Sequence, residues 1–333
     1  MIGHRTTARG ALLLIACTAA VAAAAAATGA GAAKVPQIVF PLLSDVPVHD
    51  NYGDPRVNGS HAGIDIEGAP RRTPVLAAEA GRISWHTTSR RAGCMLYLYG
   101  ASGTTYLYIH LNNDRTLRND NSGKCDLGTA YTVKDGAKVT AGEMIGLNGD
   151  SGDADGNPHL HFEAHPNDGA DVNPLPYLKK AVRLLFPGRL GTRFSLGLRG
   201  TPVAAVADRL TVDVTSVRWW PGGRWTPLAR TVSLAVDPAV AADARLGELV
   251  SAQARAAQSR TAAAGTMTVF TAPAKVTEDA LRGDAGALTA ARLTTSDGTV
   301  VSLDPDSVEQ PAEDEGSVFW APPDWLPDGG RPF

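Results

Sequence analysis

Two short segments of the chain carry imidazole and carboxylate side chains at the spacing of a β-strand. A strand turns successive side chains to opposite faces, so in Ser60–Ile66 the residues His61 and Asp65 share one face while apolar residues fill the other. Further along the chain, His159 and His161 share a face in the same way. If the two segments are strands of one sheet, the four polar groups meet on one side of it.

His61, Asp65 and His161 together are suited to bind Zn²⁺. Two imidazoles and one carboxylate occupy three positions of a tetrahedral zinc ion and leave the fourth position open for chemistry. Either motif by itself occurs by chance in many proteins. Their combination in one β-rich region predicts a catalytic zinc site.

His110 is a further candidate because it lies near the end of a strand-like run, Tyr106–Leu111. The alternative interpretation is a half-buried strand histidine that is satisfied by a backbone carbonyl. The surrounding metal-ligand motifs favour a role in chemistry instead. His49, His86 and His165 have no motif partner, and we interpret them as surface or structural residues.

The elements that would position these groups are strands. Between His61 and Glu163, short alternating runs separated by glycine-bearing turns predict an antiparallel β-sheet, and no stretch there has a helical period. The clearest runs are Arg82–Trp85, Met95–Tyr99 and Thr105–Ile109. The polar, Asn-rich residues 112–124 indicate a long loop. We therefore predict a mainly β domain over residues 33–178.

A second region of mixed α+β character is predicted over residues 179–333. Strands are expected at 210–220, 231–236, 266–271 and 293–303, and a short helix at 177–186. Asp237 suits the N-cap of a longer amphipathic helix that Gly265 would stop. Trp219, Trp220 and Trp225 are interpreted as core residues, with a carbohydrate-stacking patch as the alternative.

The first 32 residues predict a signal peptide rather than folded structure. A positively charged start precedes an alanine-rich apolar run that ends in small residues. An uncleaved membrane anchor and a lipoprotein attached through Cys17 are the alternatives. The sequence therefore predicts a protein that is secreted or held in the cell envelope.

Cysteine content and charge limit the compartment and the partners. Cys94 and Cys125 remain after the predicted cleavage and suggest one disulfide in an oxidising compartment. Two buried free thiols are the alternative, because sequence does not show how closely the Cα atoms approach. The chain has 31 Lys and Arg against 34 Asp and Glu, so it offers no basic field for nucleic acid.

Six segments resemble, in order and rough spacing, the landmarks of the lysostaphin-type zinc endopeptidases. They are Asn51–Arg56, His61–Ile66, Thr73–Ala78, Tyr108–Leu111, Val139–Gly146 and His159–Glu163. The resemblance covers about residues 38–175 and says nothing about the C-terminal region. It implies that His61, Asp65 and His161 bind zinc and that His110 and His159 are the two catalytic histidines.

The function that this resemblance implies is an exported zinc metalloendopeptidase acting on stem or cross-link peptides of bacterial peptidoglycan. His110 and His159 would share the handling of the proton and of the oxyanion, and the sequence does not assign which histidine does which. The alternative is a non-catalytic or autoinhibited wall-binding member that regulates another hydrolase. Wall attachment through residues 179–333 is a further expectation.

Overall fold

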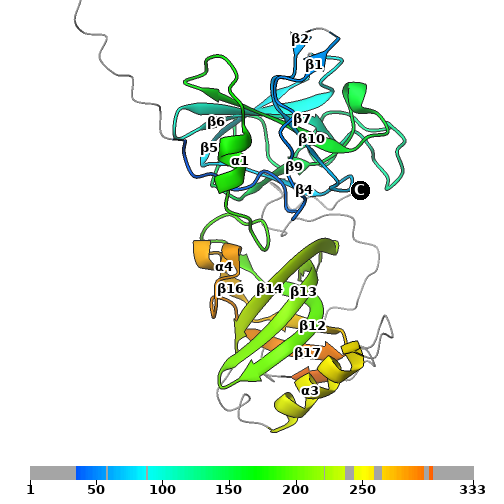
Figure 1. Cartoon of the computed structure of the whole chain (residues 1–333), viewed down its shortest axis with the longest axis vertical. Helices are drawn as coiled ribbons and strands as arrows, with labels where there is room; N and C mark the ends of the chain where they lie inside the picture. Colours follow the sequence, from blue (N-terminus) through cyan, green and yellow to red (C-terminus); the bar gives the residue numbers. More distant parts are fainter. Residues whose placement is uncertain are drawn as a thin grey trace, which may run out of the picture. The chain divides into compact units, whose positions relative to one another are not determined.

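The computed structural model describes residues 35–57, 59–87, 89–220, 222–236, 244–258, 265–295 and 300–302. The predicted signal peptide, the Cys17 alternative and the chain after Ser302 lie outside these ranges. Among the described residues, no helix has the length and apolar character to cross a membrane. Two antiparallel six-stranded sheets dominate the structure, which confirms a mainly β fold with an added α+β region (Figure 1).

The first sheet has the strand order β3-β10-β7-β6-β5-β8, and every neighbouring pair is antiparallel. Its strands are β3 (Ile64–Glu67), β10 (His159–Pro166), β7 (Thr104–Leu111), β6 (Cys94–Gly100), β5 (Gly81–His86) and β8 (Lys138–Val139). Two small sheets accompany it, which pair β1 (Pro55–Arg56) with β2 (Gly59–Ser60) and β4 (Pro74–Leu76) with β9 (Met144–Leu147). The three clearest runs predicted from sequence correspond to β5, β6 and β7.

Aromatic rings on β7 and β10 pack together in the core beneath the first sheet. Tyr106 and Tyr108 are fully buried, and their rings lie 5.7 and 5.2 Å from the ring of Phe162. A buried hydroxyl is costly unless it is hydrogen-bonded. Tyr106 donates to the Glu79 carboxylate at 2.5 Å, and the Tyr108 oxygen accepts from the Ala78 N–H at 2.9 Å. The packing therefore holds β10 firmly against β7.

The long polar loop predicted from sequence contains no strand or helix between Asn112 and Asp126. Inside it, one carboxylate oxygen of Asp114 accepts the N–H groups of Asp120 and Asn121, both at 2.8 Å. At its end, Cys125 forms a disulfide with Cys94 on β6, with the Cα atoms 5.0 Å apart. The predicted disulfide is thereby confirmed, and it ties the loop to the sheet.

The short helix after β10 differs from its prediction. Helix α1 spans Leu175–Lys180 and does not continue to Phe186. The chain leaves the helix at Ala181, whose backbone is extended, because Val182 then pairs with the segment around Val39. The Val182 N–H donates to the Ile38 carbonyl at 2.8 Å. Pairing with a distant segment overrides the local helical preference.

The second sheet has the order β14-β13-β12-β15-β17-β18. Its strands are β14 (Thr226–Ala235), β13 (Arg209–Trp219), β12 (Leu196–Val206), β15 (Met267–Thr271), β17 (Ala290–Thr295) and β18 (Val300–Ser302). Strands β11 (Arg193–Phe194) and β16 (Ala274–Lys275) pair separately, and helices α3 (Ala244–Gln258) and α4 (Glu278–Arg282) complete the region. Period-two alternation on β13 buries Leu210, Val212 and Val214.

The C-terminal region differs from its sequence predictions in two places. Strand β12 is not among the strands predicted from sequence, and Gly200 is required in it because a Cβ atom there would collide with the β13 backbone. The single run expected at 293–303 is two strands, β17 and β18. Helix α3 lies within the predicted helix, whose start at Asp237 is outside the described residues.

The tryptophan cluster divides between core and surface. Trp219 is 3% exposed and packs against the rings of Phe186 and Phe194, so its interpretation as a core residue is confirmed. Trp220 and Trp225 are only half-buried. Trp225 lies under the guanidinium group of Arg199, 4.0 Å from the ring centroid, among other contacts.

Replacing both Cys94 and Cys125 by Ala should lower the free energy of unfolding by about 2–4 kcal/mol, because the disulfide closes a loop of 31 residues in the unfolded chain. Urea unfolding of the double variant and of the wild type, each with and without reductant, checks this. Reductant should destabilise only the wild type. Equal stability of all four samples would show that the disulfide contributes nothing.

Candidate metal centre and active site

The adjacent strands β3, β10 and β7 carry four of the five predicted site residues, and His61 lies just ahead of β3. In the β3–β10 pair, His161 lies directly opposite Asp65. In the β10–β7 pair, His161 lies opposite Ile109, which brings His110 to the same end of the sheet. Leu160 and Phe162, the alternate residues of β10, are fully buried in the core. The period of two predicted for this strand is therefore confirmed.

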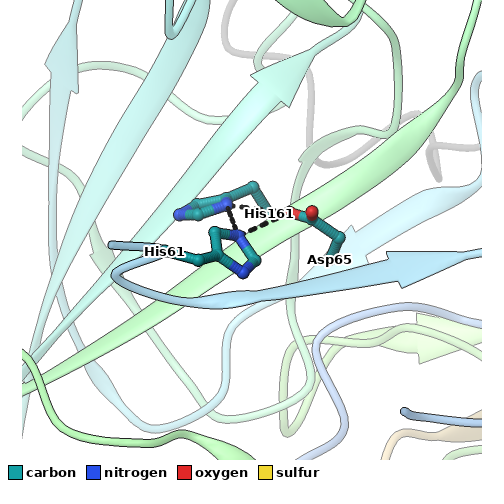
Figure 2. Close-up of side chains that lie close together, drawn as sticks. All are labelled: His61, Asp65 and His161. Atoms are coloured by element: carbon teal, nitrogen blue, oxygen red, sulfur yellow. Dashed lines mark hydrogen bonds and ion pairs between the residues drawn. The ribbon is translucent and has the colours of Figure 1, made fainter. Parts of the chain in front are cut away.

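His61, Asp65 and His161 point toward one another (Figure 2). His61 Nε2 lies 3.0 Å from Asp65 Oδ1 and 2.9 Å from His161 Nδ1, and the last two atoms are 2.9 Å apart. The outer ring nitrogens are already engaged: His61 Nδ1 donates to the Asn51 carbonyl at 2.7 Å, and His161 Nε2 donates to Glu163 at 2.9 Å. The three inward atoms, His61 Nε2, Asp65 Oδ1 and His161 Nδ1, can then each donate an electron pair. A cation bound between them would stabilise such a group.

His61 reaches this position differently from what the sequence predicts. Strand β3 begins only at Ile64, so His61 precedes the strand instead of sharing its pleat. Its backbone is held by the preceding turn, where its N–H donates to Asp54 and its carbonyl accepts from Gly53, at 2.9 and 2.8 Å. Gly63 lets the segment pass β10 closely, since a Cβ there would lie 2.6 Å from the Phe162 oxygen.

His110 and His159 stand beside this group, with their ring centroids 4.9 Å apart. Each donates its Nδ1 proton to a backbone carbonyl at 2.8 Å, His110 to Ser151 and His159 to Asn157. The Nε2 atom of each is thereby left with its lone pair. His159 Nε2 lies 3.6 Å from Asp65 Oδ1, while His110 Nε2 lies 3.8 Å from Asp153.

The backbone of His110 is unusual. Its φ angle of 62° is in the left-handed region, at a point where the pairing of β7 with β6 shifts register. Such a conformation costs free energy in a non-glycine residue and is concentrated at functional sites. Here the irregularity accompanies the hydrogen bond that fixes the imidazole against Ser151.

Burial and neighbouring groups set the charges in the site. Burial opposes the charge on Asp65, but the hydrogen bond to His161 and the nearby imidazoles outweigh it and hold its pKa far below the usual range. Burial likewise opposes protonation of His161, but Asp65 and Glu163 outweigh it and raise its pKa to about 9. A metal ion that binds His161 Nδ1 must therefore displace a proton at neutral pH.

The five residues predicted from sequence all line one open groove, with a volume of about 610 Å³. Arg56 and Val57 on the β1–β2 hairpin form part of its rim, and Arg91 and Asp153 form another part. Arg56 also pairs with Asp65 Oδ2 at 2.8 Å, on the oxygen that does not face the two histidines. The two carboxylate oxygens of Asp65 therefore differ in their contacts: Oδ1 faces the two histidines, and Oδ2 forms the ion pair with Arg56.

Sequence reasoning missed the groups that hold the site residues in place. Three of these groups are the backbone carbonyls of Asn51, Ser151 and Asn157. Every residue has a backbone carbonyl, so the pattern of side chains in the sequence does not reveal which ones accept a hydrogen bond. Glu163 was detectable, because it follows His161 by two residues and must share its face. His165 shares that face as well, and it contacts Glu163 instead of standing alone.

Comparison with known proteins gives relatives for part of the chain. The chain is 33% identical over 151 residues to the DD-carboxypeptidase/endopeptidase Mpg of Neisseria meningitidis serogroup B, which is 43% of this chain and 30% of the relative. It is 31% identical over 115 residues to an uncharacterized metalloprotease of Haemophilus influenzae, which is 34% of this chain and 20% of that protein. The chain thus spans less than a third of the length of these curated relatives.

Among solved structures, the catalytic domain of the antimicrobial peptidase lysostaphin from Staphylococcus simulans is 29% identical. The match covers 40% of this chain and 92% of that chain, with a TM-score of 0.32. No protein-family model matches the chain. The first sheet with its flanking segments is an antiparallel β-sheet region that carries a His/Asp/His group able to hold a metal ion. The predicted resemblance agrees with the curated relatives of this region, of which one is named a DD-carboxypeptidase/endopeptidase and another a metalloprotease.

The buried state of His110 should make the metal-free protein sensitive to acid. Burial lowers the pKa of His110 from 6.5 to about 4, so the unfolded chain binds this proton more tightly and stability falls as the pH drops from 6.5 to 4. The slope from one such group is at most about 1.4 kcal/mol per pH unit. His110→Asn should flatten it, as measured by urea unfolding in chelator. Identical slopes in variant and wild type would contradict the expectation.

Proposed function

We propose that this chain is an exported zinc-dependent endopeptidase that hydrolyses peptide bonds in bacterial peptidoglycan. The observation that carries the proposal is the convergence of three inward donor atoms beside two histidines whose Nε2 lone pairs are free, all in one groove. The DD-carboxypeptidase/endopeptidase activity in the name of the meningococcal relative supports a peptidase. The peptidoglycan substrate rests on the family resemblance.

Zn²⁺ fits the donor set formed by His61 Nε2, Asp65 Oδ1 and His161 Nδ1. Imidazole and carboxylate are ordinary zinc ligands, and three of them leave a position open for the reaction. When bound, zinc polarises the scissile carbonyl and lowers the pKa of water toward about 7. The protein contributes orientation, because each inward atom is fixed by the hydrogen bond on the far side of its own group.

His110 and His159 handle the proton in this proposal. Because the Ser151 and Asn157 carbonyls hold the Nδ1 protons, the Nε2 atoms are the ones able to accept a proton from the attacking water. Once protonated, either imidazole can donate to the oxyanion or to the leaving amine. Burial lowers the pKa of His110 to about 4, which keeps it neutral and ready to accept at neutral pH.

The groove and the disulfide support an extracellular peptide substrate. An open groove along the sheet accommodates an extended, flexible peptide, and its rim has both cationic and anionic side chains. A disulfide such as Cys94–Cys125 is typical of exported proteins. Export would follow from the predicted signal peptide, and attachment to the wall through residues 179–333 is part of the same proposal.

The alternative is a wall-binding protein without catalysis. Such a protein would not need two histidines with their free nitrogens facing the groove. All five residues that the family resemblance implies are present and lie together, which favours catalysis.

Incubating the purified protein with isolated cell walls should release new muropeptides, and a chelator should stop the release. His61→Ala and Asp65→Ala should lose both zinc and activity. His159→Ala and His110→Ala should retain zinc but lose about 10²–10⁴ in kcat, because proton transfer contributes a factor of that size. Metal analysis and chromatography of the released fragments measure these effects.

His49→Ala is the matched control, since His49 is exposed and is not among the groove-lining residues. It should behave as the wild type. Release that continues in chelator, or full activity of His61→Ala, would overturn the zinc peptidase proposal. Binding to walls without release by the zinc-loaded wild type would favour the non-catalytic alternative.

A further inference from the structure

Strand β10 carries four polar side chains on one face. His159, His161, Glu163 and His165 alternate with Leu160, Phe162 and Ala164, which are fully buried. The first member stands in the proposed catalytic pair and the second in the metal centre. The remaining two, Glu163 and His165, belong to neither group, although Glu163 lines the groove.

Glu163 contacts His161 on the side away from the metal centre. Its Oε1 atom accepts from His161 Nε2 at 2.9 Å, and the residue is only 9% exposed. Gly63, which immediately precedes β3, leaves the space for this contact, because a Cβ atom there would lie 2.8 Å from His161 Nε2 and 2.9 Å from Glu163 Cγ. The absence of a side chain at Gly63 therefore allows the imidazole and the carboxylate to meet.

His165 contacts the other oxygen of the same carboxylate. Its Nε2 atom lies 2.7 Å from Glu163 Oε2, and its Nδ1 atom lies 3.0 Å from the Gly169 carbonyl. The turn that presents this carbonyl has Asn167 and Asp168 in the left-handed region, both with φ of 55°. Both ring nitrogens of His165 thus face acceptors, which fixes the orientation of its ring. Because His165 contacts Oε2, the Oε1 atom of Glu163 can accept the hydrogen bond from His161.

We infer that Glu163 and His165 are positioning residues for the metal ligand His161. Glu163 holds the proton of His161 on Nε2 and sets the ring plane, so that the lone pair on Nδ1 points toward His61 and Asp65. His165 in turn holds the Glu163 carboxylate in the orientation that this requires. The inference deepens the proposed function, on which it rests for the identity of the metal.

The physical reason is the choice between two tautomers. A neutral imidazole has one N–H and one lone pair, and only the nitrogen with the lone pair can bind a metal. A carboxylate on Nε2 selects the N–H there and increases the electron density that Nδ1 offers. Loss of such a partner typically costs a factor of about 10–100 in metal affinity.

Zinc affinity of the full chain, measured by competition with a chromogenic chelator, tests the inference. Glu163→Ala should weaken zinc binding by about 10–100-fold. Glu163→Gln keeps an oxygen for the His161 N–H and should lose less, under about 10-fold, and His165→Ala should fall between wild type and Glu163→Ala. The visible absorption spectrum of the cobalt-substituted protein should change in Glu163→Ala, because the orientation of a ligand changes.

Glu67→Gln is the matched control for charge. Glu67 is exposed, lines the same groove and lies on β3 opposite His159, so its replacement removes one negative charge near the metal without touching His161. It should bind zinc within about 2-fold of the wild type. An equal loss in Glu67→Gln and Glu163→Gln would overturn the inference, because charge alone would then explain both.

Wild-type affinity and an unchanged cobalt spectrum in Glu163→Ala would also overturn it. Circular dichroism in chelator establishes that each variant is folded. If Glu163→Ala does not fold, the double variant Glu163→Gln/His165→Ala decides: a loss of affinity supports the inference, and wild-type affinity overturns it. Failure of the proposed function has a different signature, namely a wild type that binds zinc but releases no muropeptides.

Discussion

The register between β3 and β10 is the constraint on which the site depends. It sets Asp65 opposite His161, and the alternation of strand side chains then places Leu160 and Phe162 in the core. A slip of one residue would turn the donor atoms toward the hydrophobic core and the apolar residues toward the groove. The aromatic packing of Phe162 against Tyr106 and Tyr108 opposes such a slip, so the hydrophobic core and the candidate metal-binding group specify the same register.

Most of the hydrogen-bond acceptors that orient the imidazoles of the site are backbone carbonyls and not side chains. His61, His110 and His159 each donate a ring N–H to a backbone carbonyl, and only His161 uses a carboxylate. Carbonyls in loops and turns are placed by the path of the chain, so the tautomers depend on the loops as much as on the strands. In the free protein His161 carries a proton at neutral pH, so metal binding to its Nδ1 atom depends on pH.

Ser151 connects the groove, through His110, to the disulfide. Its carbonyl accepts from His110, while its hydroxyl donates to the Leu111 carbonyl and accepts from the N–H of Cys94. Cys94 is joined to Cys125 at the end of the long loop. The loop, the strand β6 and the imidazole of His110 are therefore held through one residue. The disulfide consequently has a place in the geometry of the site as well as in stability.

The sequence by itself determined the β character of the first sheet and the alternation of polar and buried residues on β10, because alternation is a local property. Ligand chemistry together with the family resemblance predicted the five site residues that line the groove. Tertiary structure decided the rest. Long-range pairing ended helix α1 at Lys180 and drew the glycine-containing β12 into a sheet, against local preference. The position of His61 ahead of β3, the left-handed backbone of His110 and the Ser151 carbonyl that accepts from its imidazole depend on contacts between segments, 41 residues apart for His110 and Ser151, which no local pattern encodes.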